Sequence, residues 1–217
     1  LDVLNVDTAA GGASGLTTVA PRVTLLRQLR RCTPADALRL GAVRGLRQHY
    51  DAVVELSVEH SRLARSITSL LEALDDGAHV ALGSRYVPGG RVLECSLARR
   101  WVSRGVNVAL RWYTRLPQHD VAARIRAYRR VAVEQALLRA AGEREDFGLD
   151  VLLRCRQAGL QVAEVPVTVA GAVSATDLAE GRNLLGMAMG WCTSAPLDGD
   201  VQRVIDLTDP AATSPAH

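Results

Sequence analysis

Hydrogen-bond donors suited to a phosphate group cluster in the middle of the chain. The segment 83–90 reads Gly-Ser-Arg-Tyr-Val-Pro-Gly-Gly and carries Arg85, while Arg99 and Ser103 follow four residues apart. Residues at this spacing share one face of a helix, and two guanidinium groups with a hydroxyl can bind phosphate through charge-assisted hydrogen bonds. The alternative is that Arg85 and Arg99 are solvated arginines that pair with nearby acids. The residues alone leave both interpretations open.

Two histidines give weaker signals. His60 follows Glu59, and an imidazole can join a mixed metal site. A lone histidine after a strand is more often an ordinary loop residue, and the same two interpretations apply to His119 beside Asp120. The glycines at positions 11, 12 and 15 lack the spacing of a phosphate-binding loop and are typical of a turn.

A series of motifs follows the segment 83–90 in a characteristic order. The chain continues with Arg-Arg-Trp-Val-Ser-Arg-Gly-Val-Asn at 99–107, Asp120, Arg-Ala-Tyr-Arg-Arg at 126–130 and Glu-Val-Pro at 164–166. In that order the motifs resemble those of the polyprenol-phosphate mannose synthases, which are family 2 glycosyltransferases, over residues 1–169. The resemblance implies a GT-A-like (Rossmann-like) α/β domain. It also implies that a hexose is transferred from a guanosine or uridine diphosphate sugar to a polyprenyl phosphate.

The resemblance also implies roles for individual residues. It places the acceptor phosphate at Arg85, Arg99 and Ser103. The full set comprises Asp120 and Arg126 as catalytic residues, Asp7, Arg85, Arg99, Ser103 and Asp150 as substrate-binding residues, and Glu59 as a metal ligand.

The metal-binding part of the resemblance is incomplete. The family holds a divalent cation beside the departing diphosphate with an Asp-x-Asp after a strand, and Ser57, Val58 and Glu59 stand at those positions. Asp7 is followed by Thr8 where the family has two acids. We therefore expect Mg²⁺ or Mn²⁺ to bind weakly if the protein is active, with Glu59 as the remaining carboxylate.

Further departures lie downstream. Arg124 replaces the glycine of a family Gly-Phe-Arg, and its bulk is expected to obstruct the donor pocket. Asp150 replaces a glutamate, and the segment 169–176 has no cation where the family has a basic arm. The alternative function is therefore a catalytically inactive glycosyltransferase-like binding or subunit protein, and the sequence does not decide between the two.

Alternating patterns predict the elements that position these residues. Strands are expected at 1–7, 23–26, 51–56, 79–82, 124–128 and 161–169, and helices at 34–48, 63–74, 96–116, 131–140 and 147–158, with a weaker helix at 176–191. Thr33, Pro34 and Asp36 are typical of a helix start. Glu164 and Pro166 indicate an edge strand. The β-α-β alternation predicts a mainly parallel sheet in which 1–7 and 51–56 are central neighbours, with the family's first strand absent.

The predicted helix at 96–116 carries two stripes. Apolar residues form one and arginines the other: Leu97, Trp101, Val108 and Trp112 against Arg100, Arg104, Arg111 and Arg115. Such a helix packs its apolar stripe on the core and exposes its arginines, or it lies in a membrane interface with the tryptophans toward lipid and the arginines toward anionic headgroups.

Composition sets the remaining expectations. The 217 residues fit one domain at 1–195 and a disordered tail at 196–217. All 26 basic residues are arginine, and a net charge of +3 does not indicate a nucleic-acid partner. The four widely spaced cysteines are expected to be buried thiols in a reducing compartment. No apolar run reaches membrane-spanning length, so we expect a cytoplasmic protein, at most peripheral to the inner face of the cell membrane.

Overall fold

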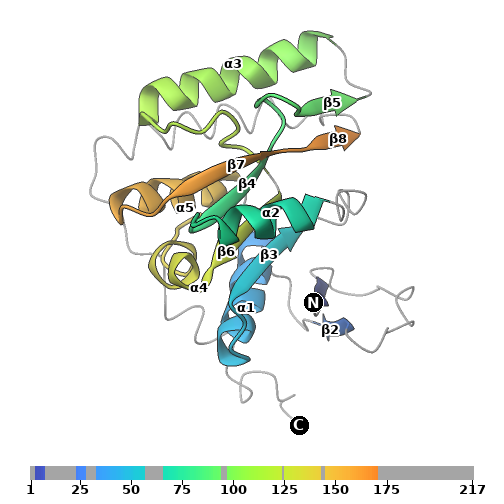
Figure 1. Ribbon diagram of the computed structural model, residues 1–217, viewed down its shortest axis with the longest axis vertical. Helices are drawn as coiled ribbons and strands as arrows, with labels where there is room; N and C mark the ends of the chain where they lie inside the picture. The colour runs from blue at the N-terminus through green and yellow to red at the C-terminus, as the bar shows by residue number, and fades with distance from the viewer. Residues whose placement is uncertain are drawn as a thin grey trace.

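The computed structural model is a mixed α/β fold, and it describes residues 3–7, 23–27, 33–56, 66–93, 97–123, 125–142 and 145–170 (Figure 1). Its elements in chain order are β1 (Val3–Asp7), β2 (Val23–Arg27), α1 (Pro34–Arg47), β3 (Ala52–Leu56), α2 (Ser66–Asp75), β4 (Val80–Ser84), β5 (Arg91–Leu93), α3 (Leu97–Thr114), β6 (Ile125–Arg129), α4 (Arg130–Ala132), the π-helix η2 (Val133–Leu137), α5 (Glu145–Gln157), β7 (Val162–Pro166) and β8 (Thr168–Ala170).

The main sheet has four strands in the order β3-β6-β4-β7. Strand β6 runs antiparallel to both of its neighbours, whereas β4 and β7 are parallel. The pairs β1-β2 and β5-β8 are also parallel. Most strand pairs in the described part of the chain are therefore parallel, as predicted, and β7 lies at an edge of its sheet, as Glu164 and Pro166 indicated.

The predicted adjacency of β1 and β3 is wrong. β1 pairs with β2 in a sheet of two strands, while β3 lies at the edge of the main sheet and pairs with β6. The helix α1 contacts both β1 and β3. A β-α-β pattern brings two strands near one helix, but hydrogen bonds between distant residues decide which strands pair, and sequence periodicity does not encode them.

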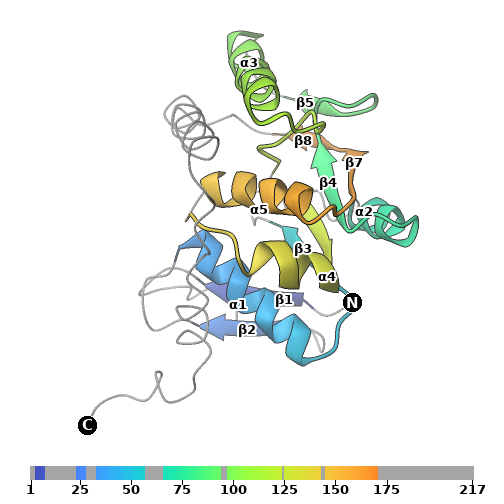
Figure 2. The same cartoon turned by 90° about the vertical axis from the view of Figure 1, so that its left-hand side faces the viewer.

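Side chains alternate between the two faces of the main sheet. In β4, Val80 and Leu82 join a core with residues of α1, α3, η2 and α5, while Ala81 packs on Leu70 and Leu74 of α2. Figure 2 shows α2 on one side of the sheet and α1, α4 and α5 on the other. Because strand residues alternate in direction, the polar side chains of β6 and its neighbours also fall on defined faces.

Helix α1 begins where its capping residues predict. The Thr33 hydroxyl accepts a hydrogen bond from the Asp36 backbone N–H, and the Asp36 carboxylate accepts one from the Thr33 N–H. Asp36 also pairs with buried Arg39 at 3.1 Å. Arg39 in turn donates to the Ala140 carbonyl at 2.6 Å and lies over the Phe147 ring. A local capping signal thus extends into a contact that fastens α1 to α5.

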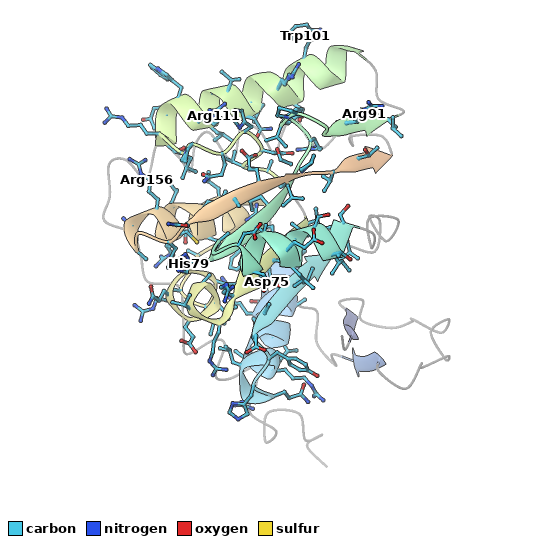
Figure 3. The ribbon with its side chains drawn as sticks, viewed as in Figure 1. Asp75, His79, Arg91, Trp101, Arg111 and Arg156 are labelled. Carbon is cyan, nitrogen blue, oxygen red and sulfur yellow. The ribbon has the colours of Figure 1, made fainter. Side chains whose placement is uncertain are left out.

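Helix α3 turns its predicted apolar stripe outward. Trp101, Val108 and Trp112 are 72%, 61% and 82% exposed, and Figure 3 shows Trp101 pointing away from the body of the molecule. Among the side chains of this helix that the structure describes, the buried ones are instead Asn107, Leu110 and Thr114. The interpretation of α3 as a core helix that buries its tryptophan stripe is therefore wrong, because a second apolar stripe of Val106, Leu110 and Tyr113 packs on the core instead.

Other predictions have mixed outcomes. The expected helix at 131–140 is a short α-turn followed by the π-helix η2. Cys155 is a buried, unbridged thiol, and burial raises its pKa to about 12, in agreement with the expectation for the cysteines. Cys32, Cys95, Cys192, the helix at 176–191 and the tail at 196–217 lie outside the described residues.

The sheet face toward α2 has no room for a side chain at residue 83. A Cβ on Gly83 would lie 2.2 Å from Ile125 Cγ2, so Gly83→Ala should lower the free energy of unfolding by about 1–3 kcal/mol. The control is Gly105→Ala, because a Cβ on exposed Gly105 meets nothing within 4 Å, and alanine within a helix should raise stability by about 0.5–1 kcal/mol. Urea denaturation measures both, and equal stability of Gly83→Ala and the native protein would contradict the packing.

Candidate functional site

An ion pair at the carboxyl end of β4 forms the centre of the site. Arg85 directly follows β4, and its guanidinium binds both oxygens of Asp120 through Nε and Nη2, each at 2.7 Å. The Arg85 backbone N–H also donates to Asp120 at 2.9 Å. The Asp120 side chain is fully buried, and the Arg85 side chain is 16% exposed. This bidentate geometry fixes the direction of the guanidinium as well as its position.

Glu164 of β7 holds the loop that carries Asp120. Its carboxylate accepts the backbone N–H of His119 at 2.8 Å and that of Asp120 at 3.0 Å. The second contact of His119 is from its ring Nδ1 to Glu164 at 2.9 Å. Glu164 lies opposite Leu82 in the parallel register of β4 and β7. Adjacent strands therefore contribute both the partner of Asp120 and the anchor of its loop.

Asn107 fastens helix α3 to the other side of the same loop. Its side-chain amide donates to the Ser103 carbonyl at 3.0 Å, and its Oδ1 accepts the Val121 backbone N–H at 2.9 Å. Asn107 is 2% exposed. Since buried amide groups need partners, these bonds fix the distance between α3 and the loop at Asp120.

Tyr86 connects Arg85 with Ser103, two of the residues assigned to the acceptor phosphate. The Tyr86 hydroxyl donates to Ser103 Oγ at 2.7 Å. The guanidinium carbons of Arg85 and Arg104 lie 5.1 and 5.7 Å from the centre of the Tyr86 ring. The structure thus brings Arg85 and Ser103 together, while the side chain of Arg99 lies outside the described residues. The alternative interpretation of the sequence is that Arg85 pairs with a nearby acid, and Asp120 is that acid.

Arg126 lies behind the site rather than in it. It is 3% exposed and donates to the backbone carbonyls of Val121, Ala123 and Gly148, at 3.1, 2.8 and 2.7 Å. A Cβ on Gly148 would lie 2.6 Å from its guanidinium, so only glycine fits there without a shift. These bonds tie the loop after Asp120 to α5, and the catalytic role assigned to Arg126 stays a prediction.

A buried polar group lies across β3 and β6 near Arg126. Glu55 is opposite Arg126 in the register and accepts the Tyr128 hydroxyl at 3.1 Å. Burial and then repulsion from Glu55 raise the pKa of Tyr128 well above its usual value. Burial alone lowers the pKa of Arg126, but attraction to Tyr128 and Glu55 outweighs it and raises the pKa. Arg126 therefore stays charged inside the domain.

The structure places the other assigned substrate residues apart from this cluster. Asp150 of α5 is buried, accepts the Ala141 N–H at 2.6 Å and pairs with Arg154 at 2.8 Å. Asp7 ends β1 opposite Arg27, and its side chain is not among those described. Substrate binding by Asp7 and Asp150 stays a prediction.

The candidate metal positions fall in a segment that the structure does not describe. Ser57, Glu59 and His60 lie there, and Arg124, the residue expected to obstruct the donor pocket, is likewise outside the described residues. Among the described residues, no three histidine, cysteine, aspartate or glutamate side chains gather as metal ligands would. The role of Glu59 as a ligand stays a prediction.

Sequence reasoning missed the connecting residues of the site. The sequence marks Asn107 as part of a motif, Glu164 as part of a motif and of an edge strand, Arg104 as part of a helical stripe, and Tyr86 as part of the segment 83–90. The sequence did contain a signal for Glu164. An acid in an edge strand beside Pro166 has few partners within its own strand, which indicates a partner elsewhere in the fold. Nothing in the sequence indicated that Tyr86 and Ser103 meet.

Comparisons with known proteins add a second line of evidence. No protein-family model matches the chain. Among curated relatives, a polyprenol monophosphomannose synthase of Mycolicibacterium smegmatis is 34% identical over 148 residues, which is 68% of this chain and 56% of that protein. An undecaprenyl-phosphate mannosyltransferase of Micrococcus luteus is 30% identical over 173 residues, 77% of this chain and 71% of that protein. A dolichol-phosphate mannosyltransferase of Pyrococcus furiosus is 24% identical over 180 residues, 81% and 49% of the two chains.

The matches differ in how much of each relative they cover. The chain spans 56% and 49% of the lengths of the Mycolicibacterium and Pyrococcus proteins. Its match to the Micrococcus protein has 30% identity and covers most of both chains. The α/β fold and the motif order agree with these matches. The chain therefore belongs to the polyprenol-phosphate mannose synthase family of glycosyltransferases, within family 2.

Proposed function

We propose that the chain transfers a mannosyl or related hexosyl group from a nucleotide-diphosphate sugar to a polyprenyl phosphate. The observation that carries the proposal is the site at the carboxyl end of β4. There Asp120 orients Arg85, and Tyr86 joins Arg85 to the Ser103 hydroxyl. The named activities of the relatives supply the reaction class, because two of them are named for polyprenol and undecaprenyl phosphate acceptors.

The reaction places its demands on phosphate groups. An acceptor phosphate oxygen bonds to the anomeric carbon of the sugar, and the bond from that carbon to the diphosphate breaks with its electron pair on the leaving group. The acceptor phosphate is already ionised at neutral pH, so a strong general base is not needed. The protein must instead orient the acceptor and stabilise the departing diphosphate. A bound divalent cation would supply part of that stabilisation.

Asp120 acts in this proposal by positioning Arg85. A buried carboxylate that binds one edge of a guanidinium leaves the side chain little rotational freedom, which lowers the entropy cost of binding an anion. Glu164 and Asn107 hold the backbone on either side of Asp120. The acceptor phosphate then meets a guanidinium and a hydroxyl that are already in place.

The exposed tryptophans of α3 favour a membrane surface as the place of reaction. Trp101 and Trp112 project from the same helix that carries Ser103. Tryptophan side chains partition into the interface of a bilayer, and exposed Arg104 can meet anionic headgroups. No described helix is long and apolar enough to cross a membrane. We propose peripheral attachment at the inner face of the cell membrane through the outer face of α3.

The inactive alternative rests on sequence departures at Ser57, Arg124 and the segment 169–176, and these lie outside the group around Asp120. Each of the relatives is named as a synthase or transferase, and the described changes leave the group around Asp120 complete. Activity of the native chain decides the question directly.

A transfer assay with a matched variant tests the function. Native protein with Mn²⁺ should move labelled mannose from guanosine diphosphate mannose to a short polyprenyl phosphate. Asp120→Asn should reduce the rate about 100-fold, because it releases Arg85 from its fixed orientation. The control is Asp75→Asn, since the Asp75 side chain is 87% exposed and forms only a long ion pair, 4.0 Å from the Arg129 guanidinium. Absence of transfer by the native protein, with uridine diphosphate sugars also inert, would favour the inactive alternative.

A metal titration tests the proposed weakness of cation binding. Ser57→Asp combined with Glu59→Asp restores the family pattern of acids, so it should lower the Kd for Mn²⁺ at least tenfold in the presence of guanosine diphosphate. Calorimetric titration measures both proteins. Tight Mn²⁺ binding by the native chain would show that Glu59 and its neighbours already suffice.

Vesicle flotation tests the membrane surface. Trp101→Ser and Trp112→Ser should each weaken binding to vesicles of anionic phospholipid about tenfold, because each removes a large apolar side chain from the interface. Tyr50→Ser is the control, since Tyr50 is also an exposed aromatic residue but follows α1 and is not part of α3. Equal flotation of the tryptophan variants and the native protein would refute attachment through α3.

A further inference from the structure

Tyr86 is the point at which the loop after β4 meets helix α3. Its hydroxyl is bonded to Ser103, and its ring contacts the guanidinium groups of both Arg85 and Arg104. Arg85 and Arg104 come from different elements, so their shared contact with one ring is a tertiary arrangement. Arg104 is exposed, whereas Tyr86 and Ser103 are half-buried. The group is therefore fixed at its base and open to solvent on one side.

The charges in this group are unevenly compensated. Asp120 offsets the charge of Arg85. Among the described residues, no carboxylate forms an ion pair with Arg104. A cation–π contact holds a guanidinium in place without neutralising it. The position beside Tyr86 consequently has a net positive charge that comes from Arg104.

The acceptor proposed above needs that charge. A phosphate monoester carries between one and two negative charges near neutral pH, and the Arg85–Asp120 pair alone offers little net charge to balance them. Ser103 can contribute further, because an oxygen that accepts from the Tyr86 hydroxyl keeps its own hydrogen for donation. A second cation within reach of Ser103 and Arg85 would complete the balance.

We propose that Arg104 is a further acceptor-binding residue and that Tyr86 is the positioning residue that holds Arg104 and Ser103 at the phosphate. The proposal rests on the proposed function, since it concerns the same acceptor. Arg104 binds the phosphate group itself, and the Tyr86 ring keeps its guanidinium from extending into solvent. The Tyr86 hydroxyl sets the direction in which Ser103 donates.

Binding of farnesyl phosphate in solution tests this assignment without a membrane. Arg104→Ala should raise the Kd about five- to tenfold at low salt, and less at high salt because the contact is partly exposed to solvent. Tyr86→Phe keeps the ring and should raise it only about threefold. Tyr86→Leu should raise it at least as much as Arg104→Ala. Arg47→Ala is the control, since it removes an equal charge from the exposed end of α1.

The combination of Tyr86→Leu with Arg104→Ala separates positioning from a loss of stability. If Tyr86 acts through Arg104, the second change should add less than about twofold to the effect of Tyr86→Leu alone. Independent, fully multiplied effects would overturn the positioning role. Binding of farnesyl phosphate by Arg104→Ala as tight as that of the native protein would overturn the role of Arg104.

Two further ligands identify the source of the phosphate. Farnesol should bind weakly to every variant, and inorganic phosphate should lose affinity on Arg104→Ala by the same factor as farnesyl phosphate. Loss of farnesyl phosphate affinity without loss of phosphate affinity would place Arg104 on the lipid chain and overturn the assignment. If the native protein binds farnesyl phosphate no better than farnesol, the acceptor in the proposed function is itself wrong. If the native protein binds well and the variants equal it, only the further inference fails.

Discussion

A fully buried carboxylate constrains the whole site. Asp120 has no exposure to water, and an ionised carboxylate in that position is unfavourable unless its oxygens are paired. Arg85 supplies three hydrogen bonds to it, one of them from its backbone. These bonds fix the backbone at the end of β4, and they therefore also fix the position of Tyr86, the next residue. The position of the loop is set by the same requirement, because Glu164 and Asn107 satisfy the backbone on either side of Asp120.

Arg126 is a second buried charge in the same region, and it is compensated in a different way. Its partners are carbonyl oxygens of one loop and one helix, and not a single carboxylate. Carbonyl dipoles satisfy the guanidinium donors, while the Glu55 carboxylate supplies negative potential across the sheet. Two of these bonds are local, to Val121 and Ala123 in the loop before β6, and the third joins β6 to α5 through Gly148. The Arg85–Asp120 pair and the bond from Arg126 to Gly148 therefore act as cross-links within the fold, while Arg104 beside Tyr86 is exposed to solvent.

Local signals in the sequence predicted local structure well. Thr33 and Asp36 predicted the start of α1, because a capping box depends on residues within one turn. Most strands were predicted within a few residues. Helix α3 was predicted in position but not in orientation, since periodicity divides a helix into stripes without saying which stripe faces the core. This helix has a second apolar stripe, Val106, Leu110 and Tyr113, and it is this stripe that packs on the core. The partners of Asp120 and the separation of β1 from β3 depend on contacts between distant residues, which no local pattern specifies.

The reversed direction of β6 has a consequence for how such proteins diversify. Leu56, at the end of β3, pairs with Ile125 at the beginning of β6, and Leu82 near the end of β4 pairs with Arg126. The connection that enters β6 thus emerges at the same rim as the connections that leave β3 and β4. Two loops from separate parts of the gene, those that carry Arg85 and Asp120, meet there while their strands remain hydrogen-bonded below. The loop that leaves β4 carries Arg85 and the loop that enters β6 carries Asp120, so an insertion in either loop would have to preserve this ion pair, and the two loops can diverge only together.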